Sequence, residues 1–252
     1  MPKLSITLAC LLTIFLLSSC GHFLSNPRSE EKANAQLQLA VDMFNERKYT
    51  QAVEASRKAL EYKPDMAAAY NHLALIYMET KRYDKSIEMF QKALAAQPNY
   101  PEVYNNMGVL YNRQGKFKEA IVLFQRALKD EKYVTPQNAH TNMGYSYYRM
   151  GQMTRAKAHH QKALDIMPSF CLASKNMGDV YVKQKRFKSA ERYFDQATEN
   201  CPLYQEARYK LGLVLVKQGK RRTAKAELNK LIRHHKKGPF VDRTNEVLKY
   251  LK

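Results

Sequence analysis

The stretch that decides the fold is CLASKNMGDVYVKQKRFKSAERYFDQATENCPLY, residues 171–204. It holds a glycine, Gly178, in its first apolar segment, a small residue, Ala190, in its second, and Pro202 near its end. The glycine recurs along the chain at positions 108, 144, 178 and 212, at intervals of 36, 34 and 34 residues. Self-similarity at a period of this length indicates an array of stacked units, in which each unit packs against its neighbours.

Two further features share this period. Small residues recur at Ala52, Ser86, Ala120, Ala156, Ala190 and Ala224, and prolines recur at Pro64, Pro98, Pro168 and Pro202. The pattern resembles the tetratricopeptide repeat (TPR). The resemblance implies two antiparallel helices per unit, with small residues at the eighth and twentieth positions that let the helix backbones approach closely. Proline falls at the unit boundary, where it stops one helix and can begin the next.

The resemblance covers six units, and the expected fold is an all-α, right-handed α-α superhelix. The units span residues 33–66, 67–100, 101–134, 137–170, 171–204 and 205–238. The first unit has Ala40 in place of the glycine and the last has Leu228 in place of an aromatic residue, as terminal repeats tend to do. Residues 239–252 are expected to form a capping helix. The two extra residues Thr135 and Pro136 predict a longer turn between units three and four.

The N-terminal segment is typical of an export signal. Residues 6–17 are almost all apolar, Lys3 precedes them, and Ser18, Ser19 and Cys20 follow. The ending resembles the lipobox of bacterial lipoproteins. This resemblance implies a signal peptide over residues 1–19 and a mature chain that begins at Cys20, acylated with diacylglycerol and an N-acyl chain. An ordinary cleaved signal or a buried first helix would also fit the apolar run.

The residues after the lipobox bear on where the protein resides. Gly21 is not the aspartate that commonly retains lipoproteins at the inner membrane, so the resemblance favours the periplasmic side of the outer membrane. Residues 20–32 contain Asn26-Pro27 and mixed charges, and they are expected to form a flexible tether. A tether of that length would keep the folded body within about 20 Å of the lipid surface.

The chain is strongly basic, with 42 Lys and Arg against 23 Asp and Glu and a net charge of +19. In the cytoplasm such an excess would suit nucleic acid, but export removes that class of partner. The excess is densest over residues 217–237, where nine Lys or Arg stand against the single acid Glu227. Such runs are most often solvated helix faces, and a specific contact with an acidic partner or anionic lipid is the alternative.

Two cysteines lie at the first and thirty-first positions of unit five, Cys171 and Cys201. In an antiparallel hairpin whose turn lies near the fifteenth and sixteenth positions, these two positions face each other. An oxidising periplasm would join the two thiols, so we expect a disulfide. Two buried free thiols are the alternative.

The sequence holds no recognisable catalytic constellation. The adjacent histidine pairs His159-His160 and His234-His235 point about 100° apart on a helix, which suits solvated or packing roles better than one metal site. Asp179 has no matched acid or base at helical spacing, and there is no phosphate-binding glycine loop or nucleophile motif. We therefore predict no enzymatic activity, no metal or cofactor and no small-molecule substrate.

A TPR array offers a concave groove lined by the first helix of each unit, and this groove is the candidate binding site for a protein partner. Apolar, aromatic and amide side chains at its expected positions suit an extended or helical peptide. These residues are Asn105, Asn106, Val109, Asn112, Asn142, Tyr145, Tyr148, Arg149, Asn176 and Val182. Packing between repeats is the alternative role for several of them. The carboxylate clamp of chaperone-binding TPR proteins is not reproduced, since Asn105 and Leu172 occupy two of its positions.

The combination of features is more specific than each part. A lipobox, a mature chain of about 230 residues, six repeats and a Tyr133-Val134-Thr135-Pro136 linker before Asn142-Met143-Gly144 resemble the type IV pilus biogenesis lipoproteins, the PilF/PilW/Tgl-type pilotins. This resemblance implies binding of the pilus secretin and promotion of its localisation and assembly in the outer membrane. An envelope scaffold that recruits peptidoglycan enzymes or proteases is the alternative, and a structural lipoprotein that contacts anionic lipid is a third hypothesis.

Overall fold

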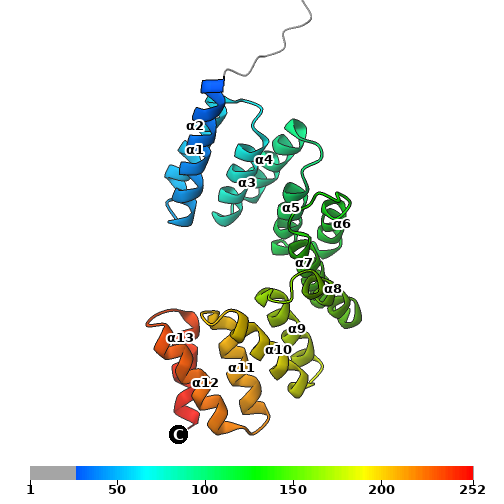
Figure 1. The fold of residues 1–252 in the computed structure, drawn as a ribbon, viewed down its shortest axis with the longest axis vertical. Helices are drawn as coiled ribbons and strands as arrows, with labels where there is room; N and C mark the ends of the chain where they lie inside the picture. The colour runs from blue at the N-terminus through cyan, green and yellow to red at the C-terminus, as the bar shows by residue number, and fades with distance from the viewer. Residues whose placement is uncertain (1–26, 252) are drawn as a thin grey trace, which may run out of the picture.

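The computed structural model describes residues 27–251, which form thirteen helices and no strand (Figure 1). The helices are α1 (Pro27–Asn45), α2 (Tyr49–Tyr62), α3 (Ala67–Glu79), α4 (Tyr83–Ala96), α5 (Pro101–Arg113), α6 (Phe117–Ala127), α7 (Pro136–Arg149), α8 (Met153–Ile166), α9 (Cys171–Lys183), α10 (Phe187–Asn200), α11 (Gln205–Lys217), α12 (Arg221–His234) and α13 (Pro239–Tyr250). The expected all-α TPR solenoid is confirmed. The predicted signal peptide and Cys20 lie outside the described residues.

Consecutive helices pair into hairpins, from α1 with α2 to α11 with α12, and each hairpin packs against the next. The first helices of neighbouring units also contact one another, as α1 and α3, α3 and α5, α5 and α7, and α7 and α9 do. Second helices make no comparable contacts among themselves within residues 27–251. The first helices therefore lie on the shorter, inner radius, and Figure 1 shows the units as an arc with α5 and α7 on its hollow side.

The turn inside each hairpin follows the same period as the sequence. One residue in each turn has a positive φ, and it is glycine in three units, as at Gly115 with φ 77°, and Lys or Arg in the others, as at Lys81 with φ 60°. An aromatic residue begins the second helix in four of the six units, at Tyr49, Tyr83, Phe117 and Phe187. These recurrent residues explain why the unit boundaries could be read from spacing.

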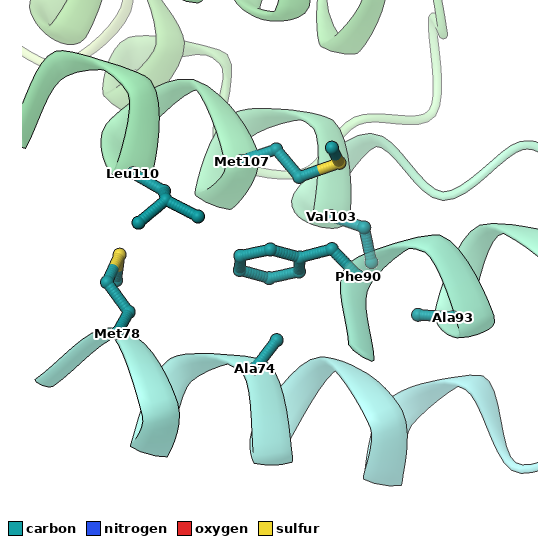
Figure 2. Close-up of a cluster of buried hydrophobic side chains, with 7 residues drawn as sticks. All are labelled: Ala74, Met78, Phe90, Ala93, Val103, Met107 and Leu110. Carbon is teal, nitrogen blue, oxygen red and sulfur yellow. The ribbon is translucent and has the colours of Figure 1, made fainter. Parts of the chain in front are cut away.

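The periodic glycines make room for side chains of the second helix. A Cβ placed at Gly178 would lie 2.5 Å from the ring of Phe194, and Gly108 stands in the same relation to Phe124. Gly108 and Gly178 thus receive an aromatic ring and Gly212 receives the Leu228 side chain, whereas the sequence pattern predicts close approach of helix backbones. Figure 2 shows the equivalent ring in unit two, Phe90, lying between Ala74 and Met78 of α3 and Met107 and Leu110 of α5.

The predicted tether is wrong for residues 27–32, because α1 begins at Pro27. Proline is favoured at the first helical position, where no backbone donor is needed. This first turn is held to the end of α2, since Ser29 donates a hydrogen bond to the Tyr62 carbonyl (2.6 Å) and Glu30 pairs with Lys63 (2.5 Å).

The expected longer turn between units three and four spans residues 128–135, against four residues at each of the other boundaries from α2–α3 to α10–α11. Part of the difference arises because α6 has 11 residues where α4, α8 and α10 have 14. Pro136 is the first residue of α7 and so belongs to the helix. At the C-terminal end, α13 contacts α11 and α12 as the expected cap. None of the helices within residues 27–251 is long and apolar enough to cross a membrane.

Candidate partner-binding groove

The predicted groove residues lie on the first helices α5, α7 and α9, on the inner side of the arc, but the structure gives them different roles. Four predicted asparagines bond to neighbouring units. Asn106 donates to the Asn71 side chain (3.1 Å), and Asn142 donates to the Asn105 side chain (3.0 Å). Asn112 accepts from Ser146 (2.8 Å). Their amides therefore hold adjacent units in register.

These asparagine bonds favour the alternative role given above for several of the predicted groove residues, which is packing between repeats. In an array, the first helices of adjacent units lie close enough for short amide side chains to reach across, and buried amides need partners. Val109 is likewise half-buried between the hydrophobic clusters of neighbouring units. Val182 is 37% exposed and does not line the pocket described next.

The remaining predicted residues come together in one pocket on the inner face, with a volume of about 290 Å³. Three helices supply most of its lining, with Tyr145, Tyr148 and Arg149 from α7, Lys175, Asn176 and Asp179 from α9, and Glu206 and Lys210 from α11. His160 of α8 completes the lining. Four of the ten predicted groove residues thus converge on what we call the unit 4–6 pocket.

One side of this pocket is an ionic network. Lys210 contacts both oxygens of the Asp179 carboxylate (2.7 and 2.8 Å) and also Glu206 (2.8 Å). Lys175 lies farther from the same acids, at 3.5 Å from Asp179 and 3.3 Å from Glu206. Burial alone would lower the pKa of Lys210, but the charges and hydrogen bonds of Asp179 and Glu206 together outweigh burial and raise the pKa. Burial and Asp179 raise the pKa of the Tyr148 hydroxyl.

The sequence alone did not indicate the two lysines that pair with Asp179 in this network. Asp179 was thought to have no partner at helical spacing, whereas Lys175 stands one turn before it on α9 and Lys210 reaches it from α11. The Glu206–Lys210 spacing of four residues was a readable signal of a helical ion pair. That both pairs meet depends on how α9 packs beside α11, which spacing within one helix does not reveal.

Arg149 stands apart from the network. Its guanidinium donates to the Tyr145 hydroxyl (2.6 Å) and lies over the rings of Phe117 (5.0 Å) and Tyr145 (5.6 Å). Among residues 27–251 it has no carboxylate partner. The stacking leaves the charge at the rim of the pocket with donors available to a ligand.

His160 occupies the place that phenylalanine takes in units two, three and five. Its ring packs on Gly144 as Phe124 packs on Gly108. The side chain is fully buried, and neither ring nitrogen has a partner in the described part of the chain. Burial lowers its pKa to about 3. The sequence interpretation left solvated and packing roles open for this histidine pair, and the structure shows packing, since His159 stacks on Tyr147.

Cys171 and Cys201 form a disulfide, with their Cα atoms 6.2 Å apart. It joins the start of α9 to the end of α10 and so closes the fifth hairpin at its open end. Because α9 carries Lys175, Asn176 and Asp179, the disulfide also anchors the helix at the centre of the pocket. Groups of three or more His, Cys, Asp or Glu suited to a metal ion are absent from residues 27–251.

Comparisons with known proteins agree with this architecture. A tetratricopeptide repeat family model matches residues 65–130 and 136–202, and a second TPR model matches residues 175–233. A search of curated proteins found no match.

Several solved structures match most of the array. PilW, described as a widely conserved type IV pilus biogenesis factor, is 26% identical with a TM-score of 0.73, over 84% of this chain and 97% of PilW. PilF of Pseudomonas aeruginosa is 22% identical with a TM-score of 0.70, over 86% and 98%. A thermophilic TPR protein of Thermus thermophilus is 19% identical with a TM-score of 0.64, over 73% and 99%. The helical hairpins, their period and these matches together place the chain in the tetratricopeptide repeat family.

Proposed function

We propose that this protein is an outer-membrane lipoprotein that binds the type IV pilus secretin and promotes its localisation and assembly there. The observation that carries the proposal is the likeness to PilW, which extends over 84% of this chain and 97% of PilW at 26% identity. An isolated TPR module would match only part of a larger protein, whereas the match covers 97% of PilW.

The proposed mechanism requires no chemistry by the protein itself. Acyl chains on Cys20 would hold the array at the membrane, and the groove would capture a secretin subunit. Linked binding of this kind raises the local concentration of subunits at the bilayer without any new contact between them. Two or more acyl chains give stable anchoring, where one chain would be marginal.

The first test is co-purification of the full chain from solubilised envelopes, followed by mass spectrometry of the proteins that accompany it. We expect secretin among the specific bands. Peptidoglycan enzymes or proteases in place of secretin would favour the envelope scaffold, which is the second candidate. Secretin multimers that form and localise equally well in cells lacking this protein would contradict the proposal.

The anchor is tested separately by Cys20→Ser. We expect this variant to leave the membrane fraction, to keep its affinity for secretin in solution and to lose its effect on secretin localisation. Cys10→Ser, in the apolar run of the same signal, is the matched control and should behave as the parent chain does. Unchanged membrane fractionation of Cys20→Ser would remove the acylation step.

A further inference from the structure

Four of the hollows on the described surface are compared as places for a ligand, and the unit 4–6 pocket differs from the other three. Hollows of about 680, 720 and 330 Å³ lie between α8 and α10, beside the loop after α6, and beside α2, α3 and α4. Their lining holds no fully buried polar side-chain atom that lacks a partner. Among these four hollows, only the unit 4–6 pocket is lined by such a group, His160.

The donors of this pocket exceed its acceptors. Its two carboxylates, Asp179 and Glu206, are bonded at 2.7 to 2.8 Å by Lys210. Lys175 is only 8% exposed, and its ammonium reaches the same acids at no less than 3.3 Å. A buried ammonium with three donors and only loose contacts has capacity for a closer acceptor. Arg149 is a second cation of the lining. Unlike Lys175, it has no carboxylate partner within residues 27–251.

Neutral donors lie beside these two cations. Asn176 is 8% exposed, and its side-chain amide bonds to no other described residue. The Tyr148 hydroxyl lines the same pocket. His160 also lines the pocket, and its fully buried neutral imidazole carries one N–H in either tautomer.

We propose that the unit 4–6 pocket binds a carboxylate of the partner peptide, held by Arg149 and Lys175 and by the amide of Asn176. The inference rests on the proposed capture of a protein in the groove and names the chemical group that is captured. A volume of about 290 Å³ suits one side chain or one chain end. A singly charged carboxylate fits better than a phosphate group, because Asp179 and Glu206 would repel a second negative charge.

The carboxylate could belong to an Asp or Glu side chain or to the partner's C-terminus, and three small probes separate these sources. N-acetylglutamate α-amide carries only the side-chain carboxylate, N-acetylglutamine carries only the terminal one, and N-acetylglutamine amide carries neither. Each is titrated into the chain from Gly21 onward, which contains every described helix. NMR signals of the Asn176 amide and the Arg149 Nε–H report on binding.

We expect saturable shifts with one or both carboxylate probes and none with the neutral amide. Arg149→Gln, at an exposed position, should weaken that binding at least tenfold, as loss of a charge-assisted hydrogen bond does. Lys175→Met should do the same, with circular dichroism to show that the fold persists. Arg155→Gln and Lys183→Met remove exposed cations outside the pocket and should leave the affinity unchanged.

Equal shifts from all three probes, or undiminished affinity in Arg149→Gln, would overturn the proposal. The co-purification experiment reports on a different claim. If secretin co-purifies but the carboxylate probes do not bind, the proposed function stands and the carboxylate site is rejected. If the probes bind but secretin does not co-purify, the carboxylate site stands and the partner is another protein.

Discussion

At the scale of single residues, the contact between Gly178 and Phe194 tests how the repeat packs. A methyl group at Gly178 would overlap the Phe194 ring, so we expect Gly178→Ala to lower the free energy of unfolding by about 1–3 kcal/mol. In the background of Phe194→Ala, which removes the ring, the same change should cost much less. Urea unfolding of the four chains of this double-mutant cycle measures the coupling. Equal cost in both backgrounds would show that the ring does not require the glycine.

His160 makes stability depend on pH. Its pKa is lowered from the ordinary 6.5 to about 3 in the folded chain, so below pH 6.5 the unfolded chain takes up a proton that the folded chain does not. The free energy of unfolding should therefore fall as the pH drops from 6.5 toward 3, by up to about 1.4 kcal/mol per pH unit from this group. His160→Phe should remove this pH-dependent contribution to the free energy of unfolding. It should also raise stability at pH 7 by roughly 1 kcal/mol, because the buried ring then has no unpaired polar atom.

The reverse exchange is the control for that prediction. Phe124→His places the same histidine against Gly108 in unit three and should add acid sensitivity. Urea denaturation of both variants and the parent chain at a series of pH values gives the slopes. If the slope of the parent chain survives in His160→Phe, other groups cause the acid sensitivity. His72 and His159 are the first to consider, since burial lowers the pKa of each to about 4.

Single residues also show where sequence reasoning stops. The groove asparagines were identified correctly as inner-face residues, because their helical positions follow from the repeat. Their hydrogen bonds could not be foreseen, since Asn105 meets Asn142 only through the offset between α5 and α7. His160 stands where units two, three and five have phenylalanine. This difference was the feature of the sequence that could have indicated an unusual pocket.

At the scale of elements, the disulfide is the covalent link of the fifth hairpin. Cys171 and Cys201 are 30 residues apart, and closing such a loop stabilises a fold by about 3–4 kcal/mol in the chain-entropy model. We expect a reductant to lower the thermal unfolding midpoint of the parent chain. The double variant Cys171→Ser/Cys201→Ser should start at the lower midpoint and show no response to reductant. A parent chain that is also unresponsive would mean that the bond contributes little.

Element boundaries were predictable wherever a residue with few conformational choices marks them. Pro101 begins α5 and Pro239 begins α13, and both positions were expected. Pro27 gave the same signal, but the charged residues after it were interpreted as a tether. The error has a tertiary cause, because contacts of Ser29 and Glu30 with the end of α2 stabilise that first turn.

At the scale of the whole molecule, the period predicted the fold because each unit contacts mainly its neighbours, so local pattern and global architecture agree. The period does not indicate which part of the surface binds a partner. The basic run illustrates this: on α12 the exposed Arg222, Lys225 and Arg233 share one face, opposite the buried Leu228 and Leu231. These three cations have no acidic partner within residues 27–251.

This basic face gives a prediction for the third hypothesis raised by the sequence. We expect the unacylated chain to sediment with vesicles that contain phosphatidylglycerol, and not with pure phosphatidylcholine, at low salt. Each cation near an anionic surface contributes about 1 kcal/mol, so Arg222→Gln/Lys225→Gln/Arg233→Gln should weaken binding on the order of a hundredfold. Binding by the parent chain should fall steeply toward about 1 M salt, where screening acts within ~3 Å.

A second triple variant decides whether the face or the total charge is responsible. Lys58→Gln/Arg82→Gln/Lys118→Gln removes three exposed cations from other elements and changes the net charge of +19 by the same amount. If vesicle binding follows the whole-molecule field, both triples should weaken it equally, and α12 would be an ordinary solvated face. If the α12 triple alone abolishes binding, the array has a second attachment point six units away from the proposed acyl anchor. Two attachment points at opposite ends would lay the array lengthwise along the bilayer, with the basic face of α12 against the lipid.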